Sequence, residues 1–392
     1  MRETSIHKHF SGIQDHRVNR TKKHPLINII FIALCAVICG AEDWVSIERF
    51  GNMRFDWLSQ FLDLSAGIPS HDTFNRVFGL IDSQSFARQF MLWAECLAEK
   101  LKKVVSFDGK SMRATKNITE GLGPLHLVNV WCSENQLVLG QELVSNKSNE
   151  ITAIPKLLEL LELEGATVTI DAMGTQKEIS KLIIAKKANY VLALKGNHGN
   201  LHADVELYFQ SVLSGKLTVK SYEHKVIEKD HGRIEERHYY TLPLPKGLRA
   251  EGWEQLNSIT MVENKRTIRE ETSAELQYYI SNIHAKAHQE IADAIRTHWQ
   301  VENCLHWRLD VSFNEDRWKS KLGNAGSNMA LINKMALNLL KMEKTAKVGI
   351  KNRRLMAGWD ENYLTKVLLA VKNWMRLPCT YTHAPMRNFL IL

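Results

Sequence analysis

The chain has 392 residues, of which 44% are hydrophobic and 24% are charged. This composition excludes a mostly disordered chain, and the length exceeds what one compact core usually holds, so two or three domains are expected. Lys and Arg outnumber Asp and Glu by 51 to 43, giving a formal net charge of +8. Such a mild excess is compatible with a polyanionic partner but does not require one.

Two further features bear on the class of protein. None of the six cysteines forms a CxxC pair, which argues against a zinc ribbon or a disulfide framework and favours reduced thiols in the cytoplasm. The apolar stretch PLINIIFIALCAVICGA, from Pro25 to Ala41, is shorter than the ~20 apolar residues of a membrane-spanning helix. We therefore predict a buried helix there, and a cytoplasmic protein without a membrane partner.

Residues 1–98 are predicted to be all-helical. Apolar residues recur at helical spacing in EDWVSIERFGNMRFDWLSQFL, and GIPSHDTFNRVFGLID offers Ser70 or Asp72 as a helix cap. Short helices of this kind suit a DNA-binding module, and they suit other small helical domains equally well.

Strands and helices alternate from residue 101. KKVVSFDGK is predicted as a strand ending at Asp108, and LHLVNVWC with QLVLGQELV as a hairpin. EITAIPKLLELLELEG is predicted as a helix closed by Gly165, ATVTIDAMG as a strand ending at Asp171, and TQKEISKLIIAKKA as a helix capped by Thr175. With the strand NYVLALKGNH, this order predicts an α/β fold with a mixed sheet and helices on its faces.

Residues 199–285 interrupt this alternation with strand-like segments, which predict a β-rich insertion. Helical periodicity returns in HQEIADAIRTHWQVENCLHWRL and continues in NAGSNMALINKMALNLLKM and NYLTKVLLAVKNWM. The predicted elements therefore enclose an insertion between two parts of one α/β unit.

Three carboxylates are candidates for chemistry. Asp108 and Asp171 each follow an apolar strand, and ligands bind beyond the carboxyl ends of parallel strands; either acid could instead cap a helix or brace a loop. Glu302 lies on a mostly apolar helix face and is predicted to point inward, where a buried charge needs a cation or another partner. Oxygen ligands of this kind suit magnesium. Asp310 is the weaker candidate, predicted to pair with a neighbour such as Arg317.

Several strings carry a resemblance to a known family. They are FSGIQDHRVNRTKKHPLINII, IPSHDTFNRVF, VSFDGKSMR, TIDAMGTQ, YVLALKGNH, HGRIEERHYY, HWQVENCLHWRLDVSFNEDR, NMALINKMALNLLK and AGWDENYL, in this order along nearly the whole chain. In these strings the chain resembles the DDE transposases of bacterial insertion sequences, and among them the H-repeat-associated transposases linked to Rhs elements.

The resemblance implies a ribonuclease-H-like catalytic core. It implies an N-terminal helical, DNA-binding domain at 1–98, a core at 99–198 and 286–345 split by the insertion at 199–285, and a C-terminal helical region at 346–392. Its acidic triad maps onto Asp108, Asp171 and Glu302, which would hold two Mg²⁺ (or Mn²⁺) ions. The implied activity is cleavage and joining of double-stranded DNA at terminal inverted repeats and at a target, by a homodimer on DNA.

Residues near the three acids are candidate DNA contacts. They are Lys110, Arg113, Lys195, Asn197, His298, Trp299, Lys319 and Lys321. The chain departs from the signature Tyr-x2-Arg-x3-Glu-x6-Lys of related transposases, because Ile295, His298 and Leu309 stand at its tyrosine, arginine and lysine places. Trp299 and Trp307 are interpreted as core packing, with base stacking as the alternative.

Other functions remain open from the sequence. A decayed or domesticated, non-catalytic DNA-binding protein and a nuclease that cuts without joining are the two alternatives. Zinc binding by His198 with His202, or by His224, His231 and His238, would be a third kind of site, but no thiolate pair completes either set.

Overall fold

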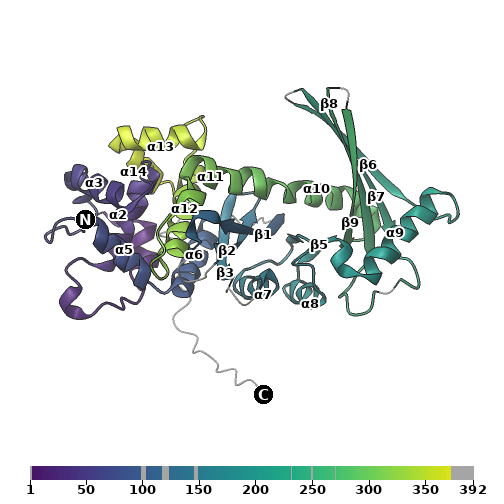
Figure 1. Cartoon of the computed structure of the whole chain (residues 1–392), viewed down its shortest axis with the longest axis horizontal. Helices are drawn as coiled ribbons and strands as arrows, with labels where there is room; N and C mark the ends of the chain where they lie inside the picture. The colour runs from purple at the N-terminus through teal and green to yellow at the C-terminus, as the bar shows by residue number, and fades with distance from the viewer. Residues whose placement is uncertain are drawn as a thin grey trace, which may run out of the picture.

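The computed structural model describes residues 2–98, 103–116, 123–144, 149–230, 232–248, 250–269 and 271–371. Figure 1 shows a helical body at one end, a sheet in the middle and a long β-arm at the other end. The helix α10 (His288–His298) runs from the arm towards the helical body and brings these parts together.

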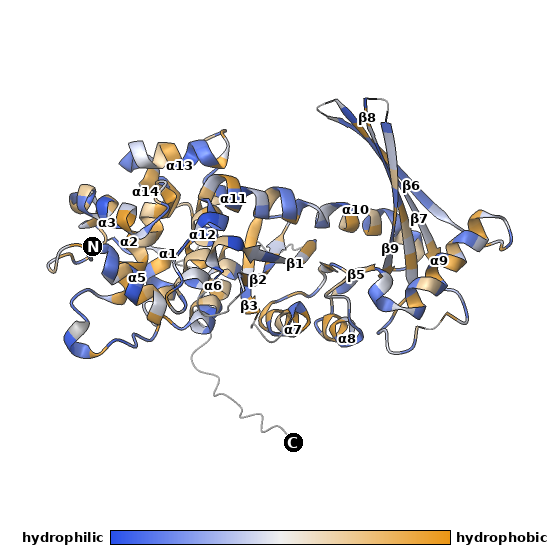
Figure 2. Ribbon diagram, viewed as in Figure 1, coloured by the Kyte–Doolittle hydropathy of each residue, from blue (hydrophilic) through white to orange (hydrophobic). Residues whose placement is uncertain are grey.

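The prediction that the first 98 residues are helical is confirmed. The helices are α1 (Ser5–Phe10), α2 (Leu26–Ile38), α3 (Trp44–Met53), α4 (Phe55–Leu58), α5 (His71–Leu80) and α6 (Ser83–Leu97), with a 3-10 turn η1 (Asn19–Thr21). Ser70 caps α5, because its side chain accepts from the N–H of Thr73. Helix α2 is apolar except at Asn28, which suits its position among neighbouring helices (Figure 2). Within the described part of the chain, no helix has the length and apolar character needed to span a bilayer.

Helix α12 (Ala325–Met342) lies at the centre of the helical body and is buried along nearly its whole length. It packs on α2, α5, α6 and the edge strand β3 (Leu137–Val144). The side chain of Asn338 accepts from the N–H of Val138 at 2.9 Å and donates to its carbonyl at 2.8 Å. Helix α12 thus provides hydrogen-bond partners for the backbone of the edge strand β3, where another strand would otherwise pair. The N-terminal helices and the sheet therefore share one hydrophobic core.

The predicted mixed sheet is present, and the described residues contribute nine strands to it, in the order β3-β2-β1-β4-β5-β9-β8-β7-β6. Strands β1 (Val104–Met112), β4 (Thr167–Ile170) and β5 (Asn189–Leu194) are parallel, and β2 (Leu125–Cys132) and β3 are antiparallel to their neighbours. Helices α7 (Glu150–Leu160) and α8 (Lys177–Ala185) cover one face, and α10 covers the other (Figure 1).

The sheet has a notch at the carboxyl ends of its two short central strands. Strand β1 pairs with β4 only as far as Phe107, although β2 accompanies it to Met112. Strand β9 (Glu271–Ser281) pairs with β5 only from Tyr278 onwards. The free edges of β1 and β9 therefore face each other across the ends of β4 and β5.

The segment predicted as a β-rich insertion, residues 199–285, begins with a helix. A 3-10 turn η3 (Gly196–His198) precedes it, and it contains α9 (Asn200–Leu213), β6 (Tyr222–Asp230), β7 (Arg233–Pro243), β8 (Ser258–Ile268) and β9. Its strands join the central sheet through β5 and β9 instead of forming a sheet of their own. The outer halves of these strands form the arm in Figure 1. Glu228 of β6 links the arm to α10. Its carboxylate accepts hydrogen bonds from Arg237 of β7 and, at 2.9 Å, from Arg296 of α10.

Three predicted boundaries were wrong. Asp108 lies within β1 and not at its end, since β2 continues the pairing beyond it. The helix predicted to close at Gly165 ends at Leu160, after which buried Leu161 and Leu163 continue in a loop. Thr175 does not cap α8; its hydroxyl donates to the carbonyl of Asp171.

The helix that carries Glu302 is interrupted. After α10 a π-helical turn, η5 (Val301–His306), leads into α11 (Trp307–Phe313). A 3-10 turn η6 (Glu315–Arg317) follows, and α13 (Ile350–Trp359) and α14 (Glu361–Leu368) come after α12; η2 (Arg113–Thr115) and η4 (Ala285–Ala287) are further short turns. A π-helical turn is rare and often marks a functional site.

Candidate active site

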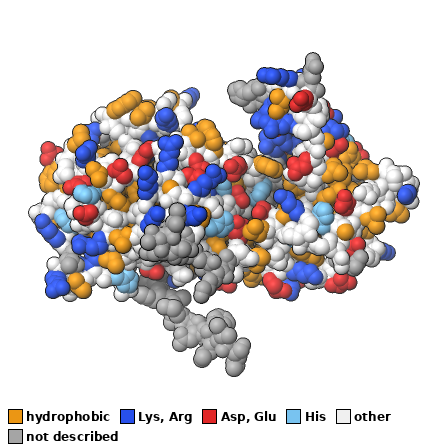
Figure 3. Space-filling model, in the orientation of Figure 1, with side chains coloured by type: hydrophobic (Ala, Val, Ile, Leu, Met, Phe, Trp, Pro, Cys, Tyr) orange, Lys and Arg blue, Asp and Glu red, His pale blue; other side chains and the backbone are white. Residues whose placement is uncertain are grey.

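The notch in the sheet forms a cleft of about 830 Å³. The cleft is lined by Asp108, Asp171, Ala172, Ala193, Leu194, Lys195, Gly196, His202, Glu275, Leu276, Gln277, Tyr278, Tyr279, His298, Trp299 and Glu302. Figure 3 shows this face of the molecule, which is indented between the helical body and the arm. All three acids predicted from the sequence lie along this one cleft.

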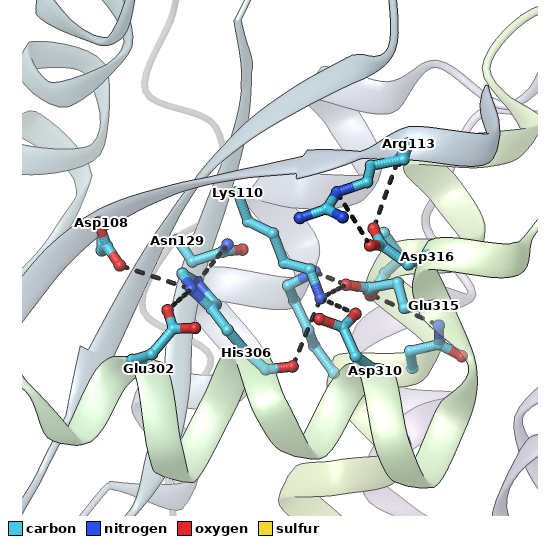
Figure 4. A network of polar contacts seen from close by, with 12 residues as sticks. Asp108, Lys110, Arg113, Asn129, Glu302, His306, Asp310, Glu315 and Asp316 are labelled. Atoms are coloured by element: carbon cyan, nitrogen blue, oxygen red, sulfur yellow. Dashed lines mark hydrogen bonds and ion pairs between the residues drawn. The ribbon is translucent and has the colours of Figure 1, made fainter. Parts of the chain in front are cut away.

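Asp108 projects from β1 towards the helix η5 (Figure 4). Its Oδ2 atom lies 3.5 Å from Nδ1 of His306. Burial raises the pKa of Asp108 to about 6; His306 opposes this rise, and Asp171, Glu150 and Glu302 add to it. The carboxylate therefore lies where a positive charge would stabilise its ionised form.

Asp171 follows β4 and is held by its own loop. Its Oδ1 accepts from the N–H of Gly174 at 3.0 Å. A Cβ at Gly174 would lie 2.5 Å from side-chain atoms of Ile154 and Ile170, so a larger residue would displace this loop. Burial raises the pKa of Asp171, partly offset by the Gly174 N–H. The loop thus fixes Asp171 in the cleft.

Glu302 lies in the π-helical turn and does not point inward as predicted. Its side chain is 66% exposed, and its Oε2 lies 3.3 Å from Nδ1 of His306. The hydrogen bond from His306 lowers the pKa of Glu302. An uninterrupted α-helix was assumed in the prediction, and the π-helical turn changes which residues face the sheet.

His306 is the site residue that the sequence reasoning missed. It is buried, with Nδ1 between Asp108 and Glu302 and Nε2 3.4 Å from the side-chain nitrogen of Asn129. Its spacing of four residues after Glu302 was the available signal. One ligand atom from each of Asp108, Glu302 and His306 lies within 4.8 Å of the others, a grouping that we find nowhere else in the described ranges. Two carboxylates and an imidazole suit a divalent cation; Asp171 shares the cleft but lies outside this group.

Lys110 was predicted to contact DNA, but the structure places its ammonium in the interior. It pairs with Asp310 and lies 3.2 Å from Glu315 (Figure 4). Glu315 also pairs with Lys334, which is fully buried, at 3.4 Å. Asp310 therefore pairs with Lys110 instead of the predicted Arg317, and the segment after Glu302 is tied to β1.

The other predicted DNA contacts divide into two groups. Lys195, Lys319 and Lys321 are exposed, and the exposed guanidinium of Arg113 lies 3.6 Å from Asp316. Asn197 instead donates to the carbonyl of Ala172 at 2.8 Å and braces the loop after Asp171.

The imidazole of His298 forms a hydrogen bond with a side chain of strand β4. Its Nδ1 lies 2.9 Å from the hydroxyl of Thr169, which in turn donates to Ser106 at 2.8 Å. Burial, with a smaller effect of His306, lowers the pKa of His298 to about 4. It is therefore neutral at pH 7 and does not replace the positive charge of an arginine.

The two tryptophans of this helix are not core residues, which corrects the first interpretation. Trp299 is 49% exposed in the cleft, and Trp307 is 48% exposed and stacks with the guanidinium of Arg308.

The histidines considered for zinc have other contacts. His198 bonds to the carbonyl of Thr175, His202 packs on Tyr278, and His238 pairs with Glu223. His231 and Cys379 lie outside the described residues.

Comparisons with known proteins agree on one family. Residues 99–339 match the family model "Transposase DDE domain", and residues 7–94 match the model "DDE_Tnp_1-associated". The chain is 40% identical to the putative transposase YncI of Escherichia coli O157:H7, over 93% of this chain and 94% of the relative. It is 37% identical to the H repeat-associated putative transposase YhhI of Escherichia coli K12, over 92% of this chain and 97% of the relative.

Proposed function

The chain belongs to the family of transposases with a DDE domain, and from this premise we propose that it cleaves and joins DNA at the terminal inverted repeats of an insertion sequence. The single observation that carries the proposal is the convergence of Asp108, Asp171 and Glu302 on one cleft. These acids come from β1, from the loop after β4 and from the helix beyond the arm.

The fold supports a ribonuclease-H-like core. The order β3-β2-β1-β4-β5, with β1, β4 and β5 parallel and helices on both faces, is the arrangement that the family resemblance implies. We assign the core to residues 99–198 and 286–345, the insertion to 199–285, the N-terminal helical region to 1–98 and the C-terminal one to 346–392.

The carboxylates of the cleft support a hard divalent cation, Mg²⁺ or Mn²⁺. Asp108, Glu302 and His306 would hold one ion, and Asp171 beside Asp108 would help to hold a second. Bound ions would supply the positive charge that phosphoryl transfer between oxygen atoms requires. The residues of the chain fix the ligands: Gly174 orients Asp171, and Asn129 contacts the far side of the His306 ring.

Exposed basic residues support binding of double-stranded DNA. Lys195 lies in the cleft, Lys319 and Lys321 line a separate pocket with Trp44 and Asn75 of the N-terminal helices, and Arg113 is exposed beside Asp316. Contacts from such residues to phosphates dominate affinity and are independent of sequence. We propose that two copies of the chain assemble on paired DNA ends, because joining requires both ends at one place.

A supercoiled plasmid that carries paired element ends tests this function. With Mg²⁺ we expect strand breaks at the ends followed by joined products. Breaks without joining would favour the nuclease alternative, and specific binding without breaks would favour the non-catalytic DNA-binding protein.

Replacing Lys195 by Ala should weaken DNA binding uniformly across sequences and reduce the slope of log K against log salt by about 1, as for one lost phosphate contact. The measurement is a salt titration of binding by fluorescence anisotropy. Lys181→Ala is the matched control, because Lys181 is an exposed lysine of α8 paired with Glu178. Equal slopes for the wild type and Lys195→Ala would contradict a phosphate contact at Lys195.

A further inference from the structure

A fourth carboxylate lies against the residue that follows Asp108. Successive residues of a strand point to opposite faces, and Asp108 points towards η5 while Gly109 faces α7. Glu150, the first residue of α7, places its carboxylate directly against Gly109. Neither the sequence reasoning nor the family triad includes Glu150.

Glu150 is held firmly in this position. It is buried, and its Oε1 lies 2.7 Å from Nε2 of His126 on the neighbouring strand β2. The other ring nitrogen of His126 lies 2.9 Å from the hydroxyl of Ser111. The hydrogen bond with Glu150 raises the pKa of His126. A chain of hydrogen bonds from Ser111 through His126 to Glu150 thus spans the part of β1 that β4 no longer accompanies.

Gly109, which has no side chain, leaves the space that the carboxylate of Glu150 occupies. A Cβ at position 109 would lie 1.9 Å from Oε1 of Glu150 and 2.9 Å from Nε2 of His126. Any other residue would force the pair away from β1. Gly109 therefore has a steric role that is independent of its backbone conformation.

The carboxylate of Glu150 also acts electrostatically on two acids of the cleft. Burial is the main cause of the raised pKa of Asp108 and of Asp171, and the charge of Glu150 adds to both shifts. The carboxylate of Glu150 therefore adds negative charge behind the strand that carries Asp108, which a bound cation would offset, and His126 partly balances this charge when it is protonated.

We propose that Glu150, oriented by His126, is a positioning residue of the cation site, which supports β1 behind Asp108 and raises the affinity of the cleft for a divalent cation. This inference rests on the proposed function, since it concerns the same site. It does not make Glu150 a ligand: its carboxylate acts through its charge and through the backbone at Gly109.

Binding of Mn²⁺ to the full chain without DNA, followed by electron paramagnetic resonance, tests the inference. We expect Glu150→Gln to weaken Mn²⁺ binding about tenfold, the effect of one nearby charge in a partly solvated site. The Mg²⁺ concentration for half-maximal cleavage should rise by the same factor, with the rate at saturating Mg²⁺ within about twofold of the wild type. Glu150→Asp, which keeps the charge, should retain Mn²⁺ affinity within about threefold.

Glu142→Gln is the matched control, because Glu142 pairs with Lys156 of the same helix α7 at 2.8 Å. It should leave Mn²⁺ affinity unchanged. Mn²⁺ affinity of Glu150→Gln equal to that of the wild type would overturn the inference, as would equal weakening by Glu150→Gln and Glu150→Asp. If Glu150→Gln does not fold, His126→Gln serves instead. It should weaken Mn²⁺ binding, because Glu150 loses the partner that holds it against Gly109, and unchanged or tighter binding in that variant overturns the inference.

The same titration separates this inference from the proposed function. A wild-type chain that binds no Mn²⁺, or an Asp108→Asn variant that binds it normally, would contradict the cation site itself. A wild-type chain that binds Mn²⁺ through Asp108 but is insensitive to Glu150 would contradict only the role of Glu150.

Discussion

Replacing Asp108 by Asn is expected to lower Mg²⁺-dependent DNA cleavage by at least ~1000-fold, while DNA affinity stays within about twofold. Asp108 is the acid that both joins the group with Glu302 and His306 and shares the cleft with Asp171. The amide keeps the size of the side chain but not its negative charge. Because phosphoryl transfer depends on positioning and charge neutralisation, loss of one carboxylate should stop the chemistry without releasing the DNA.

Cleavage of a labelled transposon end and its binding, measured in the same buffer, check this expectation. Asp293→Asn is the matched control, because Asp293 lies on the exposed side of α10, and its activity should equal that of the wild type. An Asp108→Asn protein whose nicking rate in Mg²⁺ falls by less than ~100-fold would remove Asp108 from the active site.

Replacing Lys110 by Met should reduce the free energy of unfolding by about 3 kcal/mol, near the lower end for a broken buried ion pair. The substitution leaves Glu315 in the interior with Lys334 as its remaining cationic partner, and it leaves Asp310 unpaired. The cost stays near the lower end because the side chain of Asp310 is 37% exposed and water can partly solvate it. Urea unfolding of the two proteins measures the difference.

Lys110→Met should leave the salt dependence of DNA binding unchanged, unlike Lys195→Ala. Lys116→Met is the control for stability, because Lys116 is exposed at the end of η2; its effect should stay within about 0.5 kcal/mol. A stable Lys110→Met protein with a reduced salt slope would show that Lys110 contacts phosphate after all.

The sequence predicted the order of strands and helices well because periodicity is local. The meeting of Asp108 and Asp171 in one cleft was also predictable, because the carboxyl ends of parallel strands lie at one edge of a sheet. The limits of strands depend on partners: Asp108 lies inside β1 because β2 continues beside it, and no local signal reveals this.

Contacts between distant segments and one irregular helical turn explain the other differences. Lys110 looked like a surface lysine after an acid, and its burial depends on Asp310 and Glu315, about 200 residues away. Glu302 was predicted to point inward on a regular helix, and the π-helical turn exposes it instead. His306 was visible only as a neighbour of Glu302 on a helix, and its role depends on Asp108 from β1.

The burial of α12 has a consequence for how such proteins diversify. Residues 1–98 enclose a helix that comes more than 200 residues later in the chain, and that helix also closes the edge of the sheet at Val138. A transplanted N-terminal region would therefore have to match a foreign α12 side chain by side chain, at interior packing density. New specificity in this architecture is expected to arise by substitution of outward-facing residues on a retained scaffold, and not by shuffling of modules.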